Sequence, residues 1–262
     1  TQKLHDAGAT QYLCPGVCGW NQFVNLVEPS YINISKMCSF AHKYKALGVL
    51  NTDWGDFGHI NHPEFALIGL IYGAAFSWNR EITSFEEINT QIAQLEFGDS
   101  SQELVKRIAS ISRERVFEWY HIVYLKEMDA KQKTSEEKRD YLMSLDFAGV
   151  KSANEQLTVI INELYENIHH LQADKRSLIK PYILAAEATQ IFNSIGATLQ
   201  KLKYGASNEF VANPSELASR LEQWFYQYKT VWRSVSKESE LYRLQEVIVW
   251  YADELRSLII LD

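Results

Sequence analysis

The spacing of apolar residues divides the chain into two unlike parts. In residues 1–79, short continuous apolar runs alternate with stretches in which apolar side chains recur every three or four positions. Short runs are typical of buried strands, and the longer period is typical of helices. The pattern therefore predicts the order strand, loop, helix, strand, loop, helix, with strands at 10–17 and 48–54 and helices at 31–47 and 65–76.

Residues 83–262 have helical periodicity nearly throughout. Amphipathic segments are expected near 101–130, 135–147, 150–173 and 175–203. Close to the end of the chain, apolar residues alternate by three and four positions, which predicts a seam buried in a helical bundle. The members of this seam are Leu241, Leu244, Ile248, Tyr251, Leu255 and Leu258.

Short polar motifs predict where several helices begin. Ser84-x-x-Glu87 and Ser100-x-x-Glu103 fit capping boxes, in which a hydroxyl and a carboxylate satisfy the first backbone N–H groups. Asn213-Pro214 fits an N-cap followed by a proline in the first turn. No Pro-rich or Gly/Ser-rich linker separates the two parts. We therefore expect a mainly α-helical protein in which a bundle, residues 81–262, packs on an α/β part, residues 1–80.

Composition and charge limit the kinds of partner that we expect this protein to bind. The net charge is −7 and no long basic run is present, which argues against a surface that follows nucleic-acid phosphates. No apolar run reaches the ~18–20 residues that span a bilayer, so no membrane partner is expected. An odd count of cysteines, with Cys14, Cys18 and Cys38, does not form a disulfide framework. Neither zinc nor another cofactor is expected, and reduced thiols weakly favour a cytoplasmic location.

Residues 51–59, "NTDWGDFGH", crowd polar and aromatic side chains onto the end of the second predicted strand. Polar residues at the carboxyl ends of parallel strands project into the ligand crevice of α/β proteins. Trp20 and Asn21 follow the first strand, while Asp53 and Trp54 end the second. Two indoles and a carboxylate on one rim suit a sugar, since indoles pack on its apolar face and carboxylates accept from its hydroxyls.

Spacing alone leaves a structural alternative open for this motif. Trp54 would then cap the core, and the Asp residues would cap the following helix. His59 and His62 together with Asp56 also resemble a metal-ligand pattern, but a loop that lines a sugar pocket explains them better.

The order "CPGVCGWNQF … INISKM … GVLNTDWGDFGHINHPEFALIGLIYGAAFSWN" resembles the carboxyl-terminal part of the catalytic barrel of glycoside hydrolase family 20, the β-N-acetylhexosaminidases. The resemblance covers about residues 10–79. Its most specific piece is TDWGD-x-GH followed by an apolar helix that ends in GAAFSWN. The helical remainder is similar only in kind to the bacterial branch in which a helical domain follows the barrel.

The resemblance implies a (β/α)8 barrel of which this chain holds the seventh and eighth strands. Members of the family release terminal β-linked N-acetylhexosamine with retention, and the acetamido group of the substrate acts as the nucleophile. Their catalytic Asp–Glu pair follows the fourth strand, and nothing in this chain matches it. We therefore expect no catalytic residue here and no activity from the chain alone.

The resemblance carries a few site residues to this chain. Trp54 matches the tryptophan that forms a wall of the terminal-sugar pocket. Asp56 matches an acidic residue, often Glu, that holds sugar hydroxyls. Trp20 and Asn21 fall in a loop where the family also places binding residues, although the alignment is loose there. With Asp53, these residues form the expected substrate-binding set.

Strand count predicts that the chain is a carboxyl-terminal fragment, because such a barrel needs about 250 residues. Its expected partners are an amino-sugar glycoside and the remainder of the barrel. A non-enzymatic helical interaction or accessory domain, with a vestigial α/β part, remains the alternative.

Overall fold

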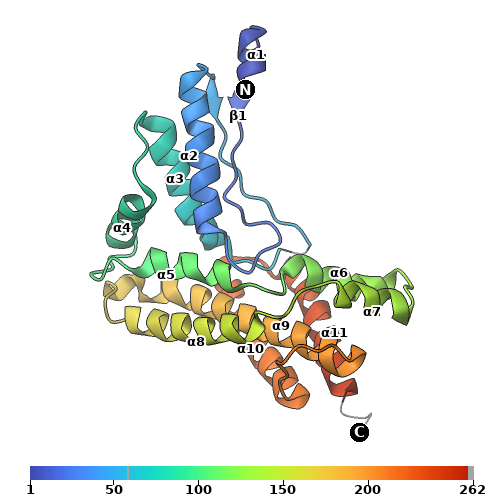
Figure 1. Ribbon diagram of the computed structural model, residues 1–262. Coiled ribbons are helices and arrows are strands. Elements are labelled where there is room, and N and C mark those ends of the chain that lie inside the picture. Colours follow the sequence, from blue (N-terminus) through green and yellow to red (C-terminus); the bar gives the residue numbers. More distant parts are fainter. Residues whose placement is uncertain (58, 259–262) are drawn as a thin grey trace.

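The computed structural model describes residues 1–57 and 59–258, and these form a mainly helical protein, as expected. Figure 1 shows α2 and α3 standing side by side on a layer of helices that includes α5, α8 and α9. The elements of the amino-terminal part are α1 (Gln2–Asp6), β1 (Tyr12–Leu13), α2 (Val27–Lys43), β2 (Gly48–Val49), a 3-10 turn (Pro63–Ala66) and α3 (Leu67–Trp78).

The two strands pair in parallel. Tyr12 lies opposite Gly48 and Leu13 opposite Val49. An isolated parallel bridge joins Gly16 to Thr52 farther along the two segments. Strands and helices thus alternate in the expected order, but each strand is much shorter than its apolar run. A pair of such short strands does not establish a barrel, which stays a prediction.

Helix α2 begins and ends earlier than its apolar spacing predicts. It starts at Val27, with Leu26 as an extended N-cap residue, and ends at Lys43. Lys45 has a left-handed backbone, with a φ of 49°. A left-handed residue just past a helix end closes the last turn, so the helix stops there and not at Gly48.

Helix α3 lies very close to the segments that follow the strands. A Cβ atom built on Gly69 would lie 2.6 Å from the Cβ of Val17. One built on Gly73 would collide with the amide of Asn51. The Gly-x-x-x-Gly spacing of Gly69 and Gly73 therefore serves close packing of α3 on the segments that contain Val17 and Asn51.

The helical part follows α3. Its elements are α4 (Phe85–Leu95), α5 (Leu104–Ile111), α6 (Trp119–Ala130), α7 (Ser135–Met143), α8 (Val150–Asn167), α9 (Lys180–Tyr204), α10 (Pro214–Val235) and α11 (Leu241–Ser257), with 3-10 turns at Ser112–Glu114, Ala173–Ile179 and Glu238–Glu240. The segment expected near 101–130 is therefore two helices. The break is fixed by Asn193, whose Oδ1 accepts the backbone N–H groups of Val116 and Phe117 at 2.8 and 3.0 Å.

Two of the three predicted helix starts are correct. The Asn213 side chain accepts the N–H groups of Ser215 and Glu216. The Ser84 hydroxyl accepts the N–H of Glu87 at 3.2 Å and caps α4, so the hydroxyl half of the predicted capping box is formed. Each side-chain acceptor satisfies N–H groups that the first turn of a helix leaves free.

The capping box predicted at Ser100 is wrong. Ser100 instead bonds to the carbonyl of His170 through both its backbone N–H and its hydroxyl. The buried Asp99 takes its place, since its carboxylate accepts the N–H of Leu104 at 2.9 Å and so caps α5.

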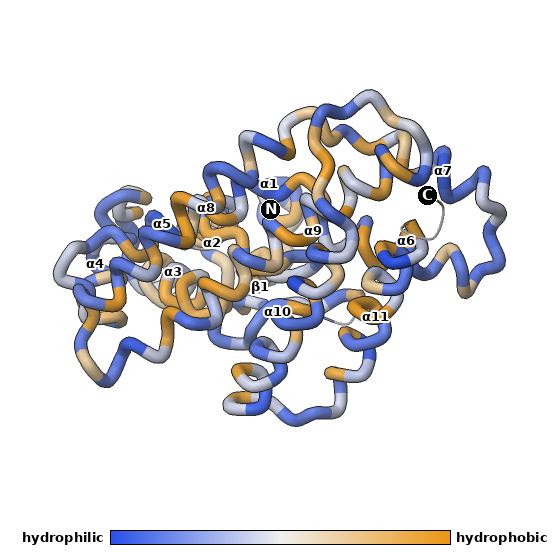
Figure 2. Tube along the Cα trace, turned by 90° about the horizontal axis from the view of Figure 1, so that it is seen from below, coloured by the Kyte–Doolittle hydropathy of each residue, from blue (hydrophilic) through white to orange (hydrophobic). Residues whose placement is uncertain are grey.

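Two hydrophobic clusters hold the chain together, and both cross the predicted boundary at residue 80. Phe23 and Ile60 join the cluster formed by α6, α9, α10 and α11. The cluster around α2 and α3 continues into α4, α5 and α8. Helix α9 contributes to both. Polar stretches lie at the periphery, as around α7 (Figure 2). The helical part thus packs on the α/β part, as expected, while the division into two domains stays a prediction.

The apolar seam of α11 is buried along its whole length, which confirms that prediction. None of the described helices has the length and apolarity needed to cross a membrane.

Candidate functional site

Two loops leave the strand pair side by side. The backbone N–H of Thr52 donates to the carbonyl of Pro15 at 2.8 Å, and the N–H of Val17 donates to the carbonyl of Thr52 at 2.9 Å. Beyond this pairing, residues 18–25 form the first loop, and the second loop includes residues 53–57 and 59–62. Both loops therefore start at one edge, where parallel α/β proteins place their ligand sites.

Two indoles lie near the side chain of Thr52. The Nε1–H of Trp54 donates to the Thr52 hydroxyl at 2.9 Å. A Cβ built on Gly16 would lie 3.2 Å from the Trp20 ring and 3.4 Å from the same hydroxyl. Trp54 is 60% exposed and Trp20 is 38% exposed. We call Trp20 and Trp54 the indole rim, since both side chains are exposed to solvent.

Next to the indole rim, polar side chains converge on the backbone of Gly19. A Cβ at this position would lie 2.7 Å from Oδ1 of Asp53 and 2.9 Å from the amide nitrogens of Asn25 and Asn61. The Asn61 amide donates to the Gly19 carbonyl at 3.0 Å and to Oδ1 of Asn25 at 2.6 Å. Glycine is therefore the only residue type at position 19 that lets Asp53 approach the two amides this closely.

Burial changes the acid–base behaviour of the second loop. It raises the pKa of the Asp53 carboxyl, and the nearby His59 opposes this shift. Burial lowers the pKa of the His59 imidazole, against the pull of Asp53 and Asp56. Both groups therefore favour their neutral forms more than they would in water. A ligand that supplies hydrogen-bond partners here would stabilise the carboxylate.

The two loops also hold uncommon backbone conformations. Left-handed φ angles occur at Cys18 (52°), Asn21 (61°), Phe57 (51°) and His59 (47°). Such angles are costly for residues other than glycine and cluster at functional sites. The first loop also has one free thiol that is buried, that of Cys18.

Several buried polar atoms in these loops have no hydrogen-bond partner among the described residues. They are Oδ1 of Asn21, Nδ1 of His59, Oδ1 of Asn61 and Nε2 of His62. Each such atom costs about 1–3 kcal/mol if nothing satisfies it. Atoms of this kind in one pair of loops mark a place where a polar ligand or water completes the bonding.

Two helices of the carboxyl-terminal part donate hydrogen bonds to the backbone of the second loop. The Nε1–H of Trp119 on α6 donates to the Phe57 carbonyl at 2.9 Å. The Tyr228 hydroxyl on α10 donates to the carbonyl of Ile60. Sequence reasoning missed both residues, although a buried Trp or Tyr that needs a polar partner is a usable signal.

The structure brings some of the predicted site residues together and leaves others apart. Trp20, Trp54 and Asp53 come together at the indole rim. Asn21 is half-buried in the first loop, and Asp56 is exposed in the second. His62 is buried at the start of α3, where its Nδ1 accepts the N–H of Glu64 at 3.3 Å and caps the 3-10 turn.

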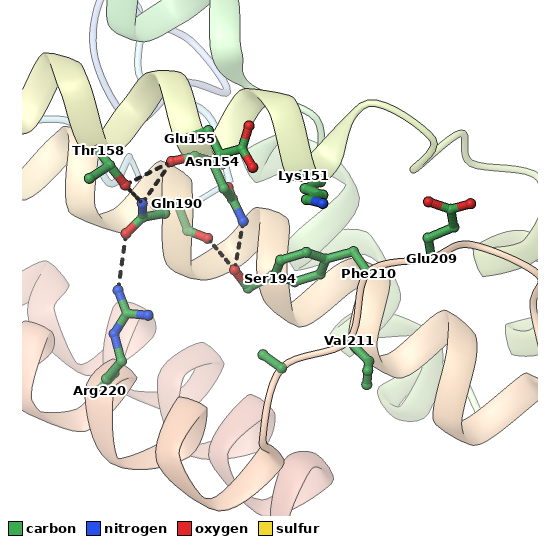
Figure 3. A pocket seen from close by; sticks show the side chains of 11 residues that line it. Lys151, Asn154, Glu155, Thr158, Gln190, Ser194, Glu209, Phe210, Val211 and Arg220 are labelled. Carbon is green, nitrogen blue, oxygen red and sulfur yellow. Dashed lines mark hydrogen bonds between the residues drawn. The ribbon is translucent and has the colours of Figure 1, made fainter.

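A separate cavity of about 620 Å³ lies between α8, α9 and α10 (Figure 3). Gln190 is central in it, with its amide nitrogen bonded to the Asn154 carbonyl and the Thr158 hydroxyl and its oxygen to Arg220. These polar groups already satisfy one another, so we assign the candidate site to the two loops.

Neither a protein-family model nor a curated protein matches the chain. We therefore infer function from the indole rim, the polar groups beside it and the motif of residues 51–59.

Proposed function

We propose that the indole rim and Asp53 bind the terminal sugar of an amino-sugar glycoside. One observation carries this proposal: two exposed indoles lie near Thr52, beside the Asp53 carboxyl, where the parallel strands end. Indole faces pack on the apolar face of a pyranose, and carboxylates accept hydrogen bonds from its hydroxyls. The unpartnered polar atoms of the same loops offer further bonds.

The activity that this site best supports is that of a retaining exo-β-N-acetylhexosaminidase of glycoside hydrolase family 20. In that reaction the substrate's acetamido group attacks its own anomeric carbon, while a carboxylic acid protonates the leaving oxygen. This departs from the usual pair of enzyme carboxylates. The chain supplies pocket walls through Trp54, Trp20 and Asp53, with Asn21 and Asp56 in the same loops. No residue of this chain matches the catalytic Asp–Glu pair of that family.

The strand pair supports the proposed barrel partner. Tyr12, Leu47 and Leu50 are exposed beside or within the two strands. Parallel sheets normally bury both faces, and two strands alone leave unpaired edges. Further strand–helix units of a barrel would cover these apolar side chains.

The proposal is tested by a Trp54→Ala variant of the 1–262 chain. We expect the affinity for N-acetylglucosamine, measured by calorimetry, to fall by about tenfold or more, because the sugar loses its stacking surface. The melting temperature should change little, since Trp54 is 60% exposed. Trp78→Ala is the matched control, because Trp78 is 87% exposed at the end of α3 and should leave affinity unchanged.

A drop in melting temperature with unchanged sugar affinity would identify Trp54 as a structural cap. Sugar binding by neither parent nor variant would favour the alternative, a non-enzymatic helical interaction domain. Hydrolysis of a chromogenic N-acetyl-β-glucosaminide by the purified chain would contradict the expectation that this chain lacks the catalytic pair.

A further inference from the structure

The cavity between α8, α9 and α10 shares no lining residue with the two loops of the candidate site. Its volume of about 620 Å³ lies within the range of small-molecule sites, roughly 300–1,000 Å³. Residues 209–212, which lead into α10, form one of its sides. The backbone N–H of Ala212 donates to the Thr198 hydroxyl at 3.1 Å, so this segment is held against α9.

Hydrogen bonds fix the polar wall of the cavity. The Asn154 amide donates to the Ser194 hydroxyl at 2.9 Å, and that hydroxyl donates to the carbonyl of Gln190 at 2.8 Å. Asn154 and Ser194 are both buried. Side chains that are held in place before a ligand arrives lose little conformational entropy when it binds.

Four charged side chains also line the cavity, and they are balanced in sign. Lys151 and Arg220 are positive, while Glu155 and Glu209 are negative. None of the four forms an ion pair with another residue in the ranges 1–57 and 59–258. A cavity with two charges of each sign suits a ligand that carries both an anionic and a cationic group.

Arg220 has donors available for a carboxylate. Its Nη2 donates to Oε1 of Gln190 at 3.1 Å, and a guanidinium carries five N–H groups. The side chain of Glu187 lies close enough for Arg220 to oppose the rise that burial causes in the pKa of that carboxyl, but the two form no ion pair. Arg220 is therefore suited to two-pronged binding of a ligand carboxylate.

Helix α9 sets the separation of the cationic and anionic ends. Arg220 contacts Gln190, whereas Asn208, the neighbour of Glu209, donates through its amide to Oε1 of Gln200 at 3.0 Å. The two glutamines are ten positions apart on α9, which is ~15 Å along the helix axis. A single amino acid is too short to reach both ends, while an extended peptide covers about 3.5 Å per residue.

We propose that this cavity binds a short peptide with free termini, its carboxylate on Arg220 and its ammonium group on Glu209 and Glu155. Three residues cover ~10 Å when extended, and the long charged side chains reach the remaining distance. Figure 3 shows Phe210 between Arg220 and Glu209, where its ring contacts an apolar side chain of the peptide. The inference goes beyond the proposed function and does not rest on it.

Calorimetry on the 1–262 chain with the tripeptide Ala-Leu-Ala tests the carboxylate end. Amidation of the peptide's carboxyl terminus should weaken binding about tenfold or more, because a hydrogen bond between two charged groups is lost. Arg220→Gln should weaken binding of the free peptide by a similar factor and leave the affinity for the amidated peptide unchanged. Arg233→Gln is the matched control, since Arg233 lies on the same helix and pairs with Glu238 outside the cavity.

The ammonium end is tested with the N-acetylated peptide. Acetylation removes the positive charge, so it should weaken binding to the parent and do so less in Glu209→Gln. Free alanine should bind at least tenfold more weakly than the tripeptide.

Absence of tripeptide binding to the parent would overturn the peptide site. An effect of amidation that persists in Arg220→Gln, or equal affinities for alanine and the tripeptide, would also overturn it. Binding of N-acetylglucosamine should be the same in the parent and in Arg220→Gln, so the peptide site and the sugar site at Trp54 stand or fall separately.

Discussion

The indole nitrogen of Trp119 donates a hydrogen bond to the carbonyl of Phe57 at 2.9 Å, across 62 positions of sequence. Trp119 is almost fully buried, and its ring meets Phe23 of the first loop edge-on at 5.9 Å. One side chain of α6 therefore contacts both loops of the candidate site. The helical part fixes the shape of the site as well as packing beside it.

Replacing Trp119 by Phe should loosen the second loop. The variant keeps an aromatic ring in the core but leaves the Phe57 carbonyl without its donor, which costs about 1–3 kcal/mol. We expect a lower free energy of unfolding in urea and weaker sugar binding. Trp250→Phe is the matched control, because the Trp250 indole bonds to Asp129 at an exposed position away from both loops. Equal effects of the two substitutions on sugar affinity would contradict a positioning role for Trp119.

Replacing Gly19 by Ala should disturb the polar groups around Asp53. The new methyl carbon would lie 2.7 Å from the carboxylate oxygen, so Asp53 or the amides must move. Overpacking of this kind costs about 1–3 kcal/mol. Gly149→Ala is the control, since a Cβ there meets no atom within 4 Å. Unfolding free energies measured side by side should fall only for Gly19→Ala. A Gly19→Ala protein as stable as its parent would show that the carboxylate is not confined.

His62 should make the protein less stable in mild acid. Burial lowers the pKa of His62 to about 4, against about 6.5 in an unfolded chain. Between these values only the unfolded state takes up the proton, so stability falls as the pH drops from about 6.5 to about 4. The loss amounts to ~3 kcal/mol at most.

His62→Asn isolates this effect, because the Asn Oδ1 replaces Nδ1 as the acceptor for the Glu64 N–H and does not titrate. Urea unfolding of parent and variant between these pH values gives the difference curve. A difference that does not change with pH would rule out His62 as the source.

Replacing Ile248 by Asp should unfold the bundle or destabilise it by several kcal/mol. Ile248 is 1% exposed in the middle of the α11 seam, and a carboxylate there has no partner. Val249→Asp places the same group one residue later, at a position that is 47% exposed. Thermal melts followed by circular dichroism should separate the two variants clearly. Similar melting temperatures would mean that the seam does not face the core.

Sequence pattern predicted the elements whose cause is local. The seam of α11 follows from apolar spacing, and the start of α10 follows from Asn213, whose side chain bonds two and three residues ahead. The predicted start of α5 is wrong, because Ser100 donates a hydrogen bond to the carbonyl of His170, 70 positions away in the sequence. The break after α5 depends on Asn193, and no pattern near Val116 reveals it.

The candidate site shows the same limit. Trp54 and Asp53 stand out in one short motif, and the parallel strands explain why Trp20 lies near them. The contact between Tyr228 and Ile60 spans 168 positions. A buried tyrosine indicates the need for a polar partner, but no sequence pattern near Tyr228 indicates that this partner is Ile60.

Helix α9 links the unfolding of the two hydrophobic clusters, because its residues belong to both. Leu184 and Phe192 pack with α10 and α11, while Tyr182 and Ala186 pack with the elements around α2 and α3. Neither cluster can unfold completely while the other cluster keeps α9 packed. The amide protons of α9 should therefore exchange with solvent only through global unfolding, more slowly than those of any helix confined to one cluster. A cut at residue 80 would thus yield two pieces that each lack part of a core.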